Sequence, residues 1–127
     1  MRRTWIFAMM ALLTGSGACA TSGSRPNAGR LPSSYAVTVV NDNWLDAVVY
    51  AVRGSARVRL GVVGGLGTTN LRIPATLITD GTFRMLVDPI GSTRTYTSDS
   101  IVVTPGQRIE LTVSSNLSMS SFAVWNR

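Results

Sequence analysis

Side chains that carry out acid–base and nucleophilic chemistry are scarce in this chain. The sequence contains no His and no Lys. It therefore lacks the base of a Ser-His-Asp triad, the lysine of a Schiff base or a P-loop, and the histidine ligands of a zinc site. A carboxylate pair remains as a route to hydrolysis, and the candidates are Asp42, Asp46, Asp80, Asp88, Asp99 and Glu110. Most of them lie at expected turns, where aspartate is favoured for its local backbone hydrogen bonds. We therefore predict a protein that is not an enzyme and has no cofactor, with a small carboxylate-dependent hydrolase as the alternative.

Two loops have compositions that invite a ligand. The glycine-rich run from Gly61 to Gly67 superficially looks like a phosphate-binding loop, but it precedes an expected strand and no Lys-Ser or Lys-Thr follows it. We interpret it as an inter-strand loop that needs positive φ angles. Asn41-Asp42-Asn43 with Asp46 could offer oxygen ligands to calcium, but the frame of an EF-hand is missing. A turn closed by side-chain hydrogen bonds is favoured there, and we predict no metal site.

Arginine supplies all the positive charge. Eight Arg stand against six acidic residues in the expected domain, 35–127, so its formal net charge is about +2. This is not the dense basic surface of a nucleic-acid-binding protein. Four arginines alternate away from apolar rows and would form one stripe if their strands are neighbours: Arg57, Arg59, Arg72 and Arg84. Such a stripe is suited to phosphate or carboxylate groups of anionic lipids or acidic glycans, and a merely solvated sheet face is the alternative.

Four aromatic residues lie close to expected strand ends or turns: Tyr35, Trp44, Tyr96 and Trp125. Half-buried packing at the ends of a sandwich is the expected role of such side chains, and a platform for a ligand is the alternative.

The N-terminal segment predicts export from the cell. Met1-Arg2-Arg3 is followed by an uncharged apolar run from Thr4 to Leu13 and then by small residues. About ten apolar residues are too few to cross some 30 Å of hydrocarbon as a helix, but they match the core of a secretory signal. Cys19 is the single cysteine, so it has no internal disulfide partner, and acylation would explain an unpaired exported thiol.

Ser16-Gly17-Ala18-Cys19 resembles the lipobox of bacterial lipoproteins, although Ser16 stands where a leucine is usual. The resemblance implies cleavage after Ala18 and a lipid on Cys19. We therefore predict a signal peptide over 1–18, a lipidated Cys19 with a flexible tether over 19–34, and a domain held in the cell envelope, at the outer membrane or facing the periplasm. The alternative is an ordinary signal-peptidase site at Ala18-Cys19-Ala20, which would release a secreted protein.

Short alternating runs separated by turn residues occupy the chain from Tyr35 onward. They predict an all-β domain over 35–127, a small antiparallel two-sheet sandwich of immunoglobulin-like shape with seven or eight strands, and a small barrel is the alternative. The expected inward rows include Val48-Tyr50-Val52, Val58-Leu60-Val62 and Phe83-Met85-Val87.

The stretches VRLGVV, LVDPIGS and VTPGQRIELTV are similar to small β-sandwich domains of uncharacterised envelope lipoproteins. That resemblance implies no particular activity. The sequence as a whole predicts an envelope-anchored binding or structural module, with an envelope protein, a glycan or a lipid as its partner and no nucleic acid.

Overall fold

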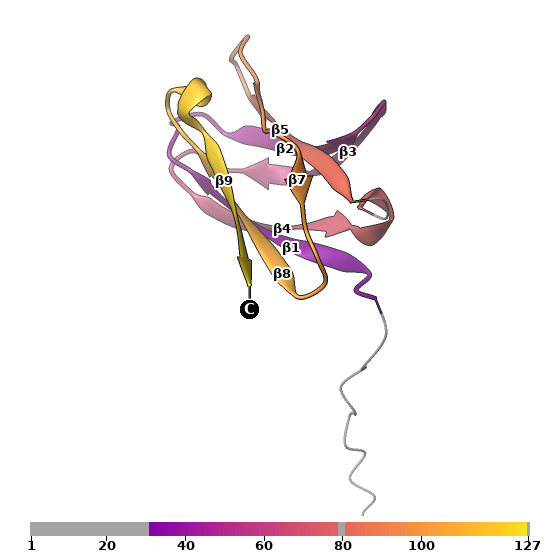
Figure 1. Ribbon diagram of the computed structural model, residues 1–127. Helices are drawn as coiled ribbons and strands as arrows, with labels where there is room; N and C mark the ends of the chain where they lie inside the picture. Colours follow the sequence, from indigo (N-terminus) through magenta and orange to yellow (C-terminus); the bar gives the residue numbers. More distant parts are fainter. Residues whose placement is uncertain (1–30, 79–80, 127) are drawn as a thin grey trace, which may run out of the picture.

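The structure is a β-sandwich of two sheets packed face to face (Figure 1). It is a computed structural model that describes residues 31–78 and 81–126. Cys19, the signal segment and Asp80 lie outside the described residues. The strands are β1 (Ser34–Asn41), β2 (Ala47–Arg53), β3 (Ala56–Val63), β4 (Thr68–Pro74), β5 (Thr82–Pro89), β6 (Tyr96–Thr97), β7 (Ile101–Val102), β8 (Gln107–Val113) and β9 (Ser121–Asn126), with 3-10 turns η1 (Ala75–Leu77) and η2 (Leu117–Met119).

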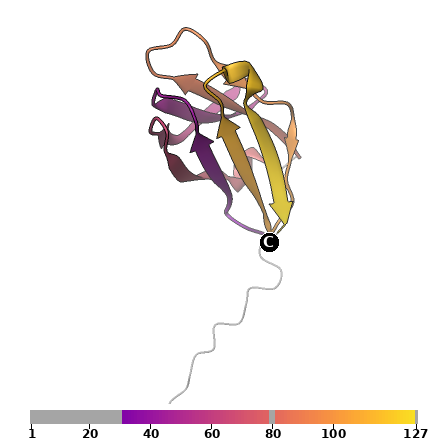
Figure 2. The ribbon, with the colours of Figure 1, turned by 90° about the vertical axis from the view of Figure 1, so that its left-hand side faces the viewer.

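The first sheet has the order β4-β1-β8-β9, and the second has the order β3-β2-β5-β6 with β7 also paired to β5. The predicted all-β, two-sheet sandwich is therefore confirmed. Two features differ in detail from the predicted antiparallel arrangement of seven or eight strands. β1 and β8 pair in parallel, with Val37 opposite Ile109, and the very short β6 and β7 raise the number of described strands to nine. Figure 2 shows β1, β8 and β9 side by side.

Alternating rows of apolar side chains from both sheets form the core. The predicted inward row on β5, Phe83-Met85-Val87, is confirmed, because each of its side chains is at most 2% exposed. The rows that pack with it are Val37 and Val39 on β1, Ala47, Val49 and Ala51 on β2, and Ile109, Leu111 and Val113 on β8. On β2 the predicted inward face was wrong, because Val48, Tyr50 and Val52 lie on the outer side. Both faces of this strand are apolar, so its alternation alone does not identify the inward one.

A β-bulge shifts the alternation along β3. Val49 of β2 lies opposite Gly61 and Tyr50 lies opposite Arg59, which leaves Leu60 as an extra residue. Val58 and Leu60 pack against the core as predicted. Beyond the bulge the pattern inverts, so Val62 is 38% exposed and Val63 is buried. The predicted inward position of Val62 is therefore wrong.

The central strand β8 offers a direct test of this core. Leu111 is fully buried, whereas Leu60 is only partly buried on the edge strand β3. Leu111→Ala should lower the free energy of unfolding by about 2–5 kcal/mol, because it removes buried methyl groups and leaves a cavity. Leu60→Ala should cost clearly less. Urea unfolding followed by circular dichroism measures both values, and an equal loss for the two variants would contradict this packing.

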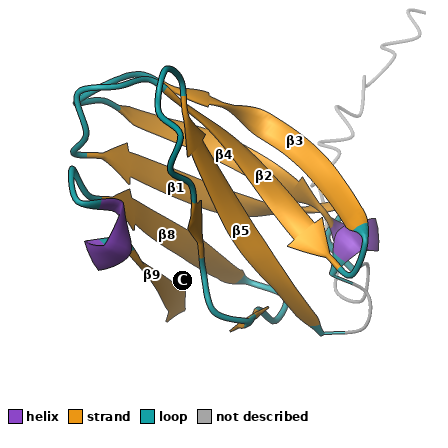
Figure 3. Ribbon diagram, turned by 90° about the horizontal axis from the view of Figure 1, so that it is seen from above, coloured by secondary structure: helices purple, strands orange, loops and turns teal. Residues whose placement is uncertain are grey.

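The two ends of the sandwich differ in their connections. Four of them meet at one end, which we call the loop end: residues 42–46, 64–67, 90–95 and 114–120. The chain enters β1 at Ser34, at the opposite end, where η1 also lies (Figure 3). Within the described ranges, no helix has the length and apolar character needed to cross a membrane.

Candidate functional site

Three of the four predicted arginines lie together on the outer face of the second sheet. Val52 of β2 lies between Arg57 of β3 and Arg84 of β5, because it pairs with both. Arg59 lies further along β3, opposite Tyr50. All three arginines are exposed. We call this surface the arginine face.

Arg72 lies on the other sheet. It belongs to β4, where it is exposed and pairs with Ala36 of β1. Its Nη1 donates a hydrogen bond to the hydroxyl of Ser34 at 3.3 Å. The chain passes from one sheet to the other between β3 and β4, so arginines that alternate in the same way on these two strands face opposite sides of the domain. The single four-arginine stripe considered from the sequence does not form.

Arg57 is partly committed to neighbours on its own sheet. Its guanidinium carbon lies 3.8 Å from the centroid of the Tyr50 ring, a cation–π contact. Its Nη2 lies 4.0 Å from Oδ2 of Asp88, and both side chains are nearly half exposed. A pair of this kind contributes at most about 1 kcal/mol because solvent screens it. The charge of Arg57 is thus partly offset within the protein.

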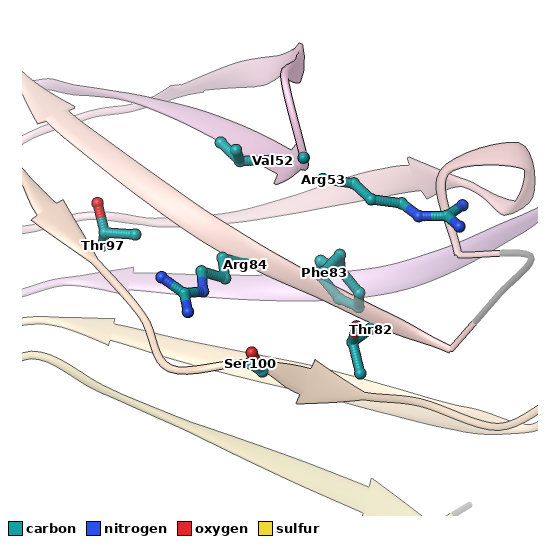
Figure 4. A pocket seen from close by; sticks show the side chains of 8 residues that line it. Val52, Arg53, Thr82, Phe83, Arg84, Thr97 and Ser100 are labelled. Carbon is teal, nitrogen blue, oxygen red and sulfur yellow. The ribbon is translucent and has the colours of Figure 1, made fainter.

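Arg84 makes no hydrogen bond or ion pair with any residue in the described ranges. It lines an open surface hollow of about 380 Å³ together with the hydroxyl-bearing residues Thr82, Thr97 and Ser100 (Figure 4). Arg53 also lines this hollow, but its Nη1 donates to the carbonyl of Leu77 at 3.4 Å. Figure 4 shows the Arg53 and Arg84 guanidinium groups pointing away from each other. Arg84 is therefore the cation of the arginine face that is best placed for an external anion.

The described carboxylates are dispersed over the domain. Asp42 and Asp46 lie in the β1–β2 connection, Asp88 on β5, Asp99 between β6 and β7, and Glu110 on β8 of the other sheet. The hollow at Arg84 and three further surface hollows have no Asp or Glu in their walls. Within residues 31–78 and 81–126, no three His, Cys, Asp or Glu side chains are grouped so that they could hold a metal ion.

The Asn41–Asp46 segment forms the hydrogen-bonded turn that the sequence favoured over a calcium site. Oδ1 of the buried Asn41 accepts a bond from the Asn43 amide at 3.0 Å, and Oδ1 of Asn43 accepts one from the Leu45 amide at 3.1 Å. The Asn41 side-chain amide donates to the carbonyls of Leu45 and Gly64, at 2.8 and 3.1 Å. These bonds fix the β1–β2 connection against the β3–β4 connection.

None of the glycines in the β3–β4 connection has a positive φ, and one of them, Gly65, is required by close packing. The residue with a left-handed backbone there is Leu66, with φ of 55°, whereas its glycine neighbours have other conformations. A Cβ atom on Gly65 would lie 2.1 Å from the carbonyl oxygen of Trp44. The Gly65 amide also donates to Oδ1 of Asp46 at 2.8 Å. The predicted reason for the glycines was therefore wrong at Gly65, where the backbones of two loops approach too closely for any side chain.

The four aromatic residues divide into two kinds. Tyr35 and Tyr96 are partly buried against the core, as predicted. Burial raises the pKa of the Tyr96 phenol, with a further contribution from the charge of Asp99, so this side chain is neutral at physiological pH. Trp44 and Trp125 are instead 80% and 50% exposed. The sequence did carry a signal for Trp44, because an apolar Trp-Leu pair stands between turn-forming residues in Asn43-Trp44-Leu45-Asp46.

No protein-family model matches the chain, and no curated protein is significantly similar to it.

Proposed function

We propose that the protein is an envelope-anchored, non-enzymatic binding module that holds anionic groups on its arginine face. The observation that carries the proposal is the guanidinium of Arg84, which has no partner among the described residues and lines the same hollow as Thr82, Thr97 and Ser100. A guanidinium binds phosphate and carboxylate oxygens through paired hydrogen bonds, and hydroxyls can donate to the same anion.

The other arginines of this face add long-range attraction. Arg57 and Arg59 lie across β2 from Arg84, and Asp88 offsets part of the charge of Arg57. The hollow is open and exposed, so its affinity for an anion depends strongly on ionic strength. Phosphate groups of lipids and carboxylates of acidic glycans share the required chemistry.

The anchor in this proposal is a lipid on Cys19. It is supported by the resemblance of Ser16–Cys19 to a lipobox and by the absence of any partner cysteine in the sequence. Residues 20–34 are rich in Ala, Ser, Gly, Pro and Asn, and a chain of that composition spans about 20 Å on average. The tether would thus keep the domain within reach of the membrane surface.

The dispersed carboxylates favour a binding module over the alternative hydrolase. Hydrolysis by a carboxylate pair requires both groups to converge on one substrate. The hollow at Arg84 has no carboxylate in its wall, and Asp88 of the same face lies beside Arg57. Within this account the secreted alternative would change the location of the domain but not its ligand chemistry.

Charge-neutralising variants on the two sheets test the proposal. Arg84→Gln should weaken binding of the domain to anionic vesicles about tenfold at low salt, because a hydrogen bond to a charged group contributes about 1.5 kcal/mol or more. Arg72→Gln is the matched control: it removes the same charge from the opposite sheet and should have little effect. Sedimentation with anionic and zwitterionic vesicles, at low salt and at 0.5 M, measures the binding, and an acidic polysaccharide serves as the second anion source.

The excess of anionic over zwitterionic binding should disappear at 0.5 M salt. An equal loss in Arg84→Gln and Arg72→Gln, or an excess indifferent to salt, would show that the arginine face is only solvated surface.

A further inference from the structure

Large apolar side chains gather at the loop end. Each of its four connections exposes at least one of them. They are Trp44 (80% exposed), Met119 (72%), Leu66 (57%), Ile90 (55%) and Leu45 (39%). Together they present on the order of 600 Å² of surface at this one end of the domain.

Hydrogen bonds hold two of these connections and the end of β8 to a common centre, the β1–β2 connection. The Leu66 amide donates to the Asn43 carbonyl at 2.9 Å, and the Ile90 amide donates to the Asp46 carbonyl at 2.8 Å. The Asp42 amide donates to the carbonyl of Val113, the last residue of β8, also at 2.8 Å. The exposed side chains of Trp44, Leu66 and Ile90 are therefore displayed from a fixed framework.

Leu66 adds an independent observation. It has φ of 55°, a left-handed conformation that is costly for a residue with a Cβ atom. Glycine would adopt this conformation freely, and glycines stand on both sides of it. The loop thus keeps an apolar side chain in contact with solvent at a conformational cost, which is typical of a functional position.

The loop end carries few charges, and a hollow between its 90–95 and 114–120 connections is lined by Arg94, Thr95, Asn116, Leu117 and Ser118. None of the five apolar side chains lines any of the four surface hollows described above. The charged residues of the four connections are Asp42, Asp46 and Arg94, and the Asp46 carboxylate accepts the Gly65 amide. Exposed apolar side chains that line no hollow and have few charges around them match a fluid apolar phase better than a charged protein partner.

We propose that the loop end inserts into the boundary between headgroups and acyl chains of a phospholipid bilayer. Trp44 suits that boundary, because its ring is apolar and its indole N–H can bond to headgroups. The inference rests on the proposed function only for the presence of a membrane nearby. The fifteen residues after Cys19, 20–34, can extend to about 50 Å, whereas the eight residues of β1 span about 26 Å. The chain is thus long enough for the loop end to turn toward the bilayer that holds the anchor.

Vesicle binding without the anchor tests this inference. A chain beginning at Ala20 carries no lipid, and it keeps the sandwich, because the buried core residues within 31–78 and 81–126 lie between Val37 and Val113. With zwitterionic phosphatidylcholine vesicles in 0.5 M salt, this chain should sediment with the lipid, and its tryptophan emission should shift to the blue. Trp44→Ser combined with Ile90→Ser should weaken binding at least tenfold. Trp125→Ser is the matched control, since it removes an exposed tryptophan near the opposite end and should leave binding unchanged.

The outcomes separate this inference from the proposed function. The variants should have unchanged melting temperatures, because the replaced side chains are exposed. An unchanged melting temperature shows that a loss of vesicle binding does not come from unfolding. Absence of zwitterionic binding, or an equal loss in Trp125→Ser, would overturn the insertion. Self-association of the wild-type chain that is lost in Trp44→Ser would also overturn the insertion, because the loop end would then bind a second copy of the chain. Arg84→Gln should retain zwitterionic binding, so failure of insertion leaves the Arg84-dependent anionic binding to be judged separately.

Discussion

Gly65→Ala should lower the free energy of unfolding by about 2–4 kcal/mol, the upper range for overpacking a close contact. The new Cβ would lie 2.1 Å from the Trp44 carbonyl oxygen and 2.7 Å from its carbonyl carbon. Both atoms are backbone, so no side-chain rotation relieves the clash. Separation of the two connections would also break the bonds from Gly65 to Asp46 and from Leu66 to Asn43. Urea unfolding of the chain beginning at Ala20 gives the loss.

The neighbouring glycine supplies the control for this prediction. A Cβ on Gly64 would meet nothing closer than Oδ1 of Asp46 at 3.8 Å, and Gly64 does not have a positive φ. Gly64→Ala should therefore change stability by no more than about 0.5 kcal/mol. Comparable losses at both positions would mean that the glycines provide flexibility, and the close approach of Gly65 to Trp44 would have no special role.

Because Gly65 lies in the loop end, Gly65→Ala should also affect lipid binding. If the framework of this end displays Trp44 and Leu66, then the variant should bind zwitterionic vesicles more weakly than Gly64→Ala does. This comparison is made well below the unfolding transition of each variant, so that it reports the arrangement of the loops.

Much of the fold follows from period-two alternation, and its limits are physical. β5 could be predicted because Phe83, Met85 and Val87 alternate with polar or less buried neighbours. The inward face of β2 could not, because its small inward residues alternate with the larger Val48, Tyr50 and Val52. The bulge at Leu60 was equally hidden: one extra residue reverses the pattern beyond it, and nothing in RVRLGVV marks the position except Gly61. The parallel pairing of β1 with β8 joins segments about seventy residues apart, which local pattern cannot reveal.

The candidate site shows the same division between local and long-range information. Alternation within each strand predicts that four arginines are exposed, and all four are exposed in the structure: Arg57, Arg59, Arg72 and Arg84. Their grouping depends on which strands share a sheet, and this separates Arg72 from the others. The turn at Asn41 could be predicted because its bonds are local, as far as Asn43 and Leu45. The exposed apolar loop end required four connections to meet, so the isolated Trp44-Leu45 pair was its only local sign.

Cys19→Ala should abolish membrane attachment, which is the largest effect the account expects. A thiol at this position would accept the diacylglycerol, and alanine has no atom that could do so. Two or three acyl chains hold a protein stably on a bilayer, whereas the loop end alone would give reversible binding. In cells grown with a palmitate analogue, the wild-type protein should carry the label and fractionate with membranes, and Cys19→Ala should lose the label. A labelled Cys19→Ala protein would contradict the assignment of the lipid to this residue.

Mass spectrometry of the mature N-terminal fragment decides whether the domain is an envelope module anchored through Cys19. The mature chain should begin at Cys19, with the mass of a diacylglycerol on its thiol and, where the host acylates the amino group, of one further acyl chain. An unmodified chain beginning at Thr21 would contradict this anchoring and would place the domain among freely secreted proteins.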